Sequence, residues 1–139
     1  MKHLRIGELA TQSNTPIETI RYYEKIGLLE KPQRTASGYR MYYNEYIEGL
    51  KFIKRAKHVG FSIKEIQELL YLRHEKHSKT CRDVKEFASK KLIDIEGKIS
   101  ELTKIKAALQ NIVNSCDGGS NSADHCNILN ALDSCKELE

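Results

Sequence analysis

Long apolar runs are missing from this sequence of 139 residues. No stretch of about 18 consecutive apolar residues occurs, so no segment has the length and character of a membrane-spanning helix. The opening Met-Lys-His-Leu-Arg also lacks the apolar core of a signal peptide. We therefore expect a cytoplasmic protein that has no membrane partner.

Motifs for catalysis are missing as well. The chain has no glycine-rich phosphate-binding loop and no Ser/His/Asp pattern. Its length allows one ordinary domain, or a small domain with an extension. We therefore expect that the protein is not an enzyme.

Cysteine is scarce, and each of the four thiols deserves an explanation. In a reducing compartment, cysteines serve as free thiols or metal ligands more often than as disulfides. The four are Cys81, Cys116, Cys126 and Cys135.

Positive charge is concentrated in the first part of the chain. Residues 1–60 hold 11 Lys and Arg against 6 Asp and Glu, a net charge of +5, whereas residues 61–139 hold 12 against 13, a net charge of −1. Six of the seven tyrosines lie in the basic part. A basic module with interleaved aromatic residues fits a polyanionic partner such as nucleic acid, although a solvated basic surface has the same composition.

Two short helices with a brief break between them are predicted over about residues 6–25. The first helix is broken at Asn14. Thr15 as the N-cap, with Pro16 at the first helical position, predicts the start of the second helix, which ends at Gly27. This arrangement is a helix-turn-helix, whose second helix enters the major groove of DNA.

A hairpin is predicted over about residues 35–43, because Gly38 is followed by a tyrosine-rich strand. It would form a wing beside the two helices. Arginine binds guanine edges or phosphates, and tyrosine hydroxyls bind phosphates. The candidate DNA-contacting residues of the second helix and the wing are therefore Arg21, Tyr22, Tyr39 and Arg40. Three more cations could widen this footprint: Lys31, Arg34 and Arg55.

Some of these residues also have a simpler explanation. One of Tyr22 and Tyr23 is expected to face the core, since aromatic residues on helices pack more often than they bind ligands. Arg21 could form a surface ion pair with Glu18 or Glu24 instead of contacting DNA.

Capping signals predict three further helices. Asn44 is expected to cap a helix over residues 45–58. Ser62 opens a capping box that starts the next helix, and Thr80 opens a similar signature that starts a long helix at Cys81.

The long helix, residues 82–115, carries a heptad seam that is typical of a helix packed along a partner helix. Cys81 and Cys116 are 35 residues apart, which is five heptads, so both lie on the seam. Only Lys106 interrupts the alternating steps of three and four. The apolar and small members are Ala88, Leu92, Ile95, Ile99, Leu102, Leu109 and Val113.

The two seam cysteines would lie roughly 50 Å apart in one straight helix, at ~1.5 Å rise per residue, so one ion cannot join them within a chain. An antiparallel dimer would bring the partner's Cys81 beside Cys116. Cys126, which follows a nine-residue loop, would complete a set of three thiolates. Thiolates select soft or borderline ions such as zinc, cadmium, lead and mercury. The alternative is that the cysteines are unrelated thiols.

The predicted fold is mainly α-helical. A winged helix-turn-helix DNA-binding domain occupies residues 1–73, a long antiparallel coiled-coil dimerisation helix residues 80–116, and a metal-binding loop with a short C-terminal helix residues 117–139. We expect a homodimer whose metal ligands are Cys81, Cys116 and Cys126.

Four motifs resemble the MerR family of bacterial transcription regulators: Arg5-Ile-Gly-Glu-Leu-Ala, Thr19-Ile-Arg-Tyr-Tyr-Glu-Lys-Ile-Gly-Leu-Leu, Gly38-Tyr-Arg-Met-Tyr and Gly60-Phe-Ser-Ile-Lys-Glu-Ile. The resemblance implies a dimer on double-stranded promoter DNA whose −35 and −10 elements are spaced too widely. It also implies that effector binding bends and underwinds the DNA so that RNA polymerase can use both elements. The DNA contacts that it implies are again Arg21, Tyr22, Tyr39 and Arg40.

The sequence resembles the zinc-, cadmium- and lead-responsive branch of that family. Its zinc-sensing members tend to carry two adjacent cysteines at the start of the loop and a histidine within it. Here Asp117 follows Cys116, and no histidine lies in mid-loop. Three thiolates without an assured fourth ligand suit a large soft ion better than tetrahedral zinc. We therefore expect cadmium or lead, with zinc or mercury as alternatives, and we assign no ligand role to Cys135 or His125.

A function of a different class is a cytosolic metal carrier. It would use the same cysteines. It would leave Arg21, the tyrosine-rich wing and the basic half of the chain unexplained.

Overall fold

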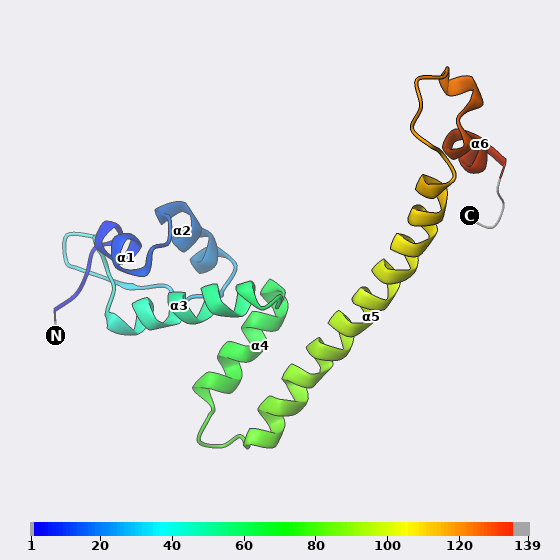
Figure 1. Cartoon of the computed structure of the whole chain (residues 1–139). Coiled ribbons are helices and arrows are strands. Elements are labelled where there is room, and N and C mark those ends of the chain that lie inside the picture. Colours follow the sequence, from blue (N-terminus) through cyan, green and yellow to red (C-terminus); the bar gives the residue numbers. More distant parts are fainter. Residues whose placement is uncertain (1, 135–139) are drawn as a thin grey trace. The chain divides into compact units, whose positions relative to one another are not determined.

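The computed structural model describes residues 2–134. It divides into two compact units, Met1–Val84 and Lys85–Glu139. Both units are mainly helical (Figure 1). Within the described range, no helix combines the length and the apolar character that a membrane span requires.

The first unit opens with the predicted pair of short helices, α1 (Ile6–Ser13) and α2 (Ile17–Lys25). Asn14, the C-cap of α1, has φ 51° and so adopts the left-handed conformation that asparagine tolerates better than most residues. The sharp change of direction at this residue confirms the predicted break and sets the two helices of the helix-turn-helix at an angle.

The N-cap of α2 differs from the prediction. Pro16 occupies that position, and no side chain caps the helix. The hydroxyl of Thr15 instead donates a hydrogen bond to the carbonyl of Ser13 at 3.2 Å. The prediction of Thr15 as the N-cap was therefore wrong, because its side chain bonds the preceding backbone and is not available to α2.

A two-stranded antiparallel hairpin follows, formed by β1 (Gln33–Arg34) and β2 (Arg40–Met41). The turn between the strands includes Gly38 at φ 90°, a conformation that favours glycine. The paired strand is shorter than predicted because Tyr42 leaves the hairpin and pairs with Leu4 through two backbone hydrogen bonds. The wing is thus tied to the segment that precedes α1.

Two longer helices complete the first unit, α3 (Asn44–His58) and α4 (Ile63–His74). The prediction of Asn44 as the cap of α3 was wrong by one residue, because Tyr43 holds that position without a side-chain hydrogen bond.

The capping box of α4 is present as predicted. The backbone N–H of Glu65 donates to Ser62 Oγ at 3.2 Å, and the backbone N–H of Ser62 donates to Glu65 Oε1 at 2.8 Å. Each bond satisfies a helix-terminal N–H group that has no partner within the helix.

The core of the first unit lies between its helices. Helix α1 packs on α2 and α3, and α4 packs on α3 (Figure 1). The ring of Tyr42 meets that of Tyr46 edge to face, with the centroids 5.1 Å apart. The largest fully buried side chains are Leu9, Ile20, Tyr42, Leu50, Ile53 and Ile66.

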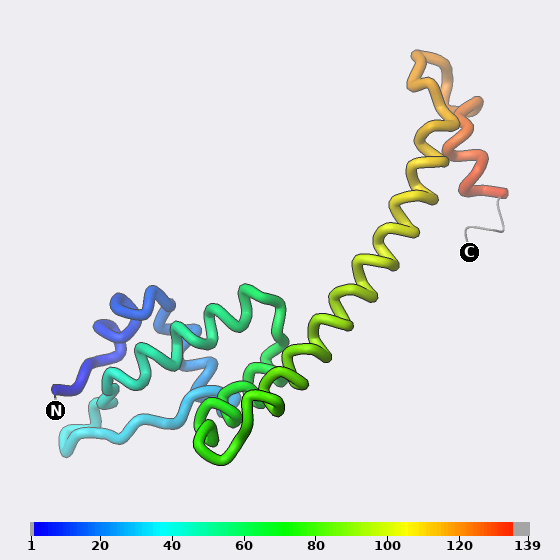
Figure 2. The backbone as a smooth tube through the Cα atoms, turned by 60° about the horizontal axis from the view of Figure 1, so that its bottom comes forward, coloured from blue at the N-terminus to red at the C-terminus, as the bar shows by residue number. Residues whose placement is uncertain are grey.

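Helix α5 (Cys81–Asn114) is one continuous helix of 34 residues (Figure 2). Its predicted start is confirmed, because Thr80 and Asp83 exchange backbone-to-side-chain hydrogen bonds of 2.8 and 3.2 Å. None of its residues is buried. Five seam residues are 51–63% exposed in the single chain: Leu92, Ile99, Leu102, Leu109 and Val113. An apolar stripe of this kind is typical of a helix that packs against a partner.

After α5 the chain turns back through a loop, the short 3₁₀ helix η1 (Ala123–His125) and helix α6 (Asn127–Ser134). Figures 1 and 2 both show α6 beside the end of α5. The side chain of Asn127 donates to the carbonyl of Ser115 at 2.6 Å and so joins the two ends of the loop. The predicted short C-terminal helix is confirmed, whereas Cys135 lies outside the described residues.

Replacing Ser62 by Ala should lower the free energy of unfolding by about 1 kcal/mol, because the N–H of Glu65 loses its acceptor at the start of α4. Urea denaturation at one fixed protein concentration measures the change, since the stability of an oligomer depends on concentration. The control Ser120→Ala alters an exposed loop serine and should shift stability by less than about 0.5 kcal/mol. Equal losses in the two variants would contradict the capping role.

Candidate functional site

Helix α2 divides its side chains between the core and an exposed face. Ile20 and Tyr23 are buried, whereas Tyr22 is 52% exposed and Arg21 is exposed. The prediction that one of the two tyrosines faces inward is confirmed, and that one is Tyr23. Arg21 and Tyr22 are therefore free to meet a ligand that approaches this face.

The alternative that Arg21 is held in a surface ion pair is not realised. In the part of the chain that the structure describes, the ion pair of Glu24 is made with Arg40 of strand β2, at 3.0 Å between Nη1 and Oε2. Arg21 reaches neither Glu18 nor Glu24 as an ion-pair partner.

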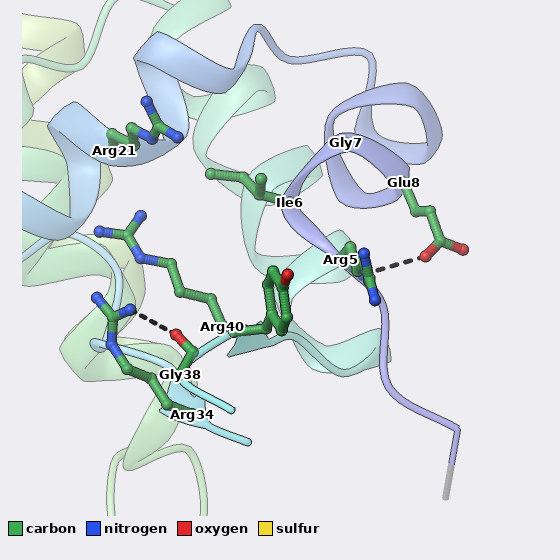
Figure 3. Close-up of a pocket in the computed structure, with 9 residues that line it drawn as sticks. Arg5, Ile6, Gly7, Glu8, Arg21, Arg34, Gly38 and Arg40 are labelled. Atoms are coloured by element: carbon green, nitrogen blue, oxygen red, sulfur yellow. Dashed lines mark hydrogen bonds between the residues drawn. The ribbon is translucent and has the colours of Figure 1, made fainter. Parts of the chain in front are cut away.

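The wing presents one exposed aromatic ring. Tyr39 is 56% exposed, and the guanidinium carbon of Arg5 lies 4.7 Å from the centre of its ring. Arg34 donates from Nη1 to the carbonyl of Gly38 at 2.8 Å, which holds the turn closed (Figure 3). The tip of the wing is thus supported both from the N-terminal segment and from strand β1.

Glu24 is a buried acid between α2 and the wing. Its carboxylate accepts a hydrogen bond from the hydroxyl of Tyr42 through Oε1 and contacts Arg40 through Oε2. Burial, followed by the hydrogen bond to Glu24, raises the pKa of Tyr42 to about 12. Tyr42 therefore stays neutral near pH 7 and remains a donor to the carboxylate.

A hollow of about 740 Å³ lies between α1, α2 and the wing (Figure 3). Three of the four predicted DNA-contacting residues line it, namely Arg21, Tyr39 and Arg40, and Arg5 and Arg34 line it too. Figure 3 shows Arg21, Arg34 and Arg40 on the same side of this hollow.

A second hollow of about 370 Å³ adjoins Glu24, and most of its charged lining is cationic. These cations are Arg21, Lys25, Lys31, Arg34 and Arg40. Arginine and lysine side chains around a concave surface attract phosphate groups. The face formed by α2 and the wing therefore has the charge and shape to hold a polyanion.

The loop between α5 and α6 brings two predicted metal ligands together. Cys116 follows the end of α5 by two residues, and Cys126 directly precedes α6. Both are half-buried free thiols, and the Cys116 side chain is one of the groups that lower the pKa of the Cys126 thiol. The backbone N–H of Gly118 also donates to Cys116 Sγ at 3.4 Å.

The start of α6 favours the ionised form of Cys126. Hydrogen bonds from the backbone N–H groups of Leu129 and then Ile128 lower the pKa of this thiol, and contact with Cys116 lowers it further. Unpaired N–H groups at a helix start stabilise a negative charge, and the thiolate is the form that ligates metals.

Cys81 is the first residue of α5 and is exposed, so the whole length of that helix separates it from Cys116. Over residues 2–134, no three His, Cys, Asp or Glu side chains gather into a group that could hold a metal ion. Asp117 accepts a hydrogen bond from the backbone of Gly119, and Asp124 bonds to Ser122. Within one chain, the loop supplies two thiols.

Two residues at the wing were not predicted from the sequence to take part in the DNA interface. Arg5 contacts Tyr39, and Glu24 joins α2 to the wing. Helical spacing could have placed Glu24, because it lies four residues after Ile20 and hence on the same buried face. No local pattern shows that Arg5 lies near residue 39.

Comparison with known proteins agrees with this architecture. The family model described as MerR HTH family regulatory protein matches residues 4–72, and the one described as MerR, DNA binding matches residues 47–112. The transcriptional regulator ZntR of Escherichia coli (strain K12) is 39% identical over 129 residues, which covers 93% of this chain and 92% of ZntR.

Two solved structures are similar over nearly the whole chain. PbrR691 from Ralstonia metallidurans CH34, in complex with lead(II), superposes with a TM-score of 0.84 at 31% identity, covering 93% of this chain and 98% of that one. MerR of Bacillus megaterium MB1, in complex with mercury(II), gives a TM-score of 0.70 at 34% identity and the same coverage. The chain therefore belongs to the MerR family of helix-turn-helix transcriptional regulators, in the branch that contains the heavy-metal regulators.

Proposed function

We propose that the protein is a metal-responsive transcription regulator, which binds promoter DNA as a homodimer and activates metal-resistance or efflux genes when it binds a soft divalent ion. The observation that carries this proposal is that the loop after α5 closes next to its two thiols. Asn127, which follows Cys126, bonds at 2.6 Å to the carbonyl of Ser115, which precedes Cys116, and the pKa of the Cys126 thiol is lowered. Lead(II) and mercury(II), which the two similar solved structures hold, are soft ions, and soft ions prefer thiolate ligands.

A third thiolate is proposed to come from the partner's Cys81. The loop of one chain supplies two thiols, and the described residues add no further group. Antiparallel pairing of the α5 seams would align position 81 of one chain with position 116 of the other, because they are separated by five whole heptads. The exposed apolar side chains of the seam support such pairing.

The DNA interface is proposed to be the face formed by α2 and the wing. Arg21 and Tyr22 would enter the major groove from α2, while Tyr39 and Arg40 would contact the phosphate backbone from the wing. The supporting observations are the exposure of Tyr22 and Tyr39 and the cations that line the two hollows. Each cation placed at a phosphate releases counterions, so affinity is expected to fall steeply with salt.

Metal and DNA binding would be coupled through the start of α5. In the proposed dimer, an ion ties the loop of one chain to the partner's Cys81, which begins α5 directly after the DNA-binding segment. Ion binding would then fix the spacing of the two DNA-binding domains. A change in that spacing could bend and underwind the promoter so that RNA polymerase reaches both of its elements.

The proposed ion is cadmium or lead. Three thiolates with no fourth donor suit a large soft ion of low coordination, whereas zinc prefers four ligands in a tetrahedron. Over residues 2–134, neither Asp117 nor Asp124 forms a group of three possible ligands with the two cysteines; Asp117 bonds to Gly119 and Asp124 to Ser122 instead. Similarity to lead-bound PbrR691 supports this choice, and similarity to ZntR and to mercury-bound MerR keeps zinc and mercury as alternatives.

A promoter-reporter titration with lead, cadmium, zinc and mercury salts tests the choice of ion. Lead or cadmium should give half-maximal induction at a concentration about tenfold or more below that for zinc, because a site with three thiolates lacks zinc's fourth ligand. Equal or greater sensitivity to zinc would contradict the proposed donor set.

Cys126→Ser should abolish metal-dependent induction, because the loop keeps one thiol and loses the one whose ionised form is favoured. Operator affinity without metal should stay within about twofold of the native value, since the substitution lies outside the DNA interface. Reporter induction and a gel-shift titration measure the two effects. Cys135→Ser is the matched control and should respond normally; a full response from Cys126→Ser would refute the ligand assignment.

A mixed dimer tests whether the site spans two chains. Chains carrying Cys81→Ser are combined with chains carrying Cys116→Ser, each with its own affinity tag, and the doubly tagged species is isolated. Such a dimer retains one complete set of three thiols and should bind one ion tightly, whereas either parent homodimer should bind none. The measurement is metal content after dialysis, and a mixed dimer without metal would exclude the cross-chain site.

A further inference from the structure

The buried carboxylate of Glu24 connects helix α2 to the wing. Glu24 is only 6% exposed, and each of its two oxygens has a partner from the second half of the hairpin region. Oε1 accepts from the hydroxyl of Tyr42, and Oε2 lies 3.0 Å from Nη1 of Arg40. The wing is therefore fixed to α2 through an acid and not through apolar packing alone.

The sign of the charge on Glu24 makes this connection unusual. It lies beside a hollow lined by Arg21, Lys25, Lys31, Arg34 and Arg40, on the face where DNA is proposed to bind. A carboxylate near DNA phosphates is repelled by them and, taken by itself, should weaken binding. If Glu24 only adds negative charge near the phosphates, removing its charge should strengthen DNA binding. If Glu24 instead orients the wing, removing its charge should weaken DNA binding.

Arg40 can form an ion pair with Glu24 and contact a ligand at the same time. A guanidinium group carries five N–H donors, and its buried Nη1 group meets Glu24 as an ion pair without an aligned hydrogen bond. The side chain of Arg40 stays 31% exposed and lines both hollows. A guanidinium held on one side by a buried acid has few orientations left, so its remaining donors keep a fixed direction.

We propose that Glu24 is a positioning residue of the DNA interface, which acts through Arg40 and holds the wing in the orientation that DNA requires. The inference rests on the proposed DNA-binding function and adds to it a residue that does not touch DNA itself. Tyr42 supports Glu24 in this role, because its hydroxyl donates a hydrogen bond to the other oxygen of the same carboxylate.

Glu24→Gln tests the proposal, since it removes the charge and keeps the shape. The probe is a DNA duplex that the native dimer selects from a random-sequence library, with a chelator present to exclude metal. Affinity for this duplex should fall by about tenfold, the size of one lost charged contact to DNA. Affinity equal to or tighter than that of the native protein would overturn the proposal.

The matched control is Glu18→Gln, which removes the same charge from an exposed position of the same helix. It should bind the selected duplex as tightly as the native protein, or slightly more tightly. A double variant, Glu24→Gln with Arg40→Gln, should bind no more weakly than Arg40→Gln alone, because Glu24 acts through Arg40. Additive losses would show that the two residues act independently and would overturn the proposal.

Tyr42→Phe keeps the test informative if Glu24→Gln does not fold. The variant retains the buried ring and loses only the hydroxyl, so affinity should fall by about threefold and amide hydrogen exchange in residues 33–41 should become faster. Native affinity together with native exchange in the wing would overturn the proposal. A native dimer that enriches no DNA sequence would instead refute the proposed function, so the two failures are distinguishable.

Discussion

The apolar stripe on α5 is the constraint on which the arrangement of the chain depends. A helix of 34 residues with no buried side chain cannot keep a row of leucine, isoleucine and valine in water without a large free-energy cost. The core cluster lies in the first unit and contains no residue of this helix. The stripe therefore has the properties of a surface that binds a second copy of the chain. Because the helix has a fixed length, antiparallel pairing along the seam would place the partner's Cys81 beside Cys116.

The two candidate sites use opposite charges in a similar way. At the wing, the buried acid Glu24 forms an ion pair with the cation Arg40, whereas after α5 the N–H groups at the start of α6 favour the anionic form of the Cys126 thiol. In both places, the charged group that would meet the ligand is held by a second group that does not itself contact the ligand. Fixing a charge before binding reduces the conformational entropy lost on binding.

Much of the fold follows from local sequence patterns. The breaks at Asn14 and Gly38, the capping box at Ser62 and the start of α5 at Cys81 each depend on residues within one turn of the chain. The caps of α2 and α3 were misplaced by one residue, because Thr15 and Asn44 have the right side chains for a cap but the backbone uses their neighbours.

The candidate sites were only partly predictable from the sequence. The sequence predicted that one of Tyr22 and Tyr23 faces inward, and the structure shows that it is Tyr23. The partners of Glu24 could not be predicted, because Tyr42 and Arg40 are distant in sequence and meet it only once the hairpin has folded back on α2. The spacing of Cys116 and Cys126 allowed them to meet, whereas their contact depends on how the loop turns.

The hydrogen bond from Asn127 to the carbonyl of Ser115 has a consequence for the evolution of the loop. It fastens together the residues that flank the two thiols, so the ends of the loop stay close whatever lies between them. The entropy cost of bringing the ends of a loop together rises only slowly with the length of the loop. The segment from Gly118 to Ser122 could therefore lengthen, shorten or change composition while the distance between the thiols is preserved. Related chains could then acquire additional donor groups in this segment, and with them a different preferred ion, without rebuilding the helix that carries the site.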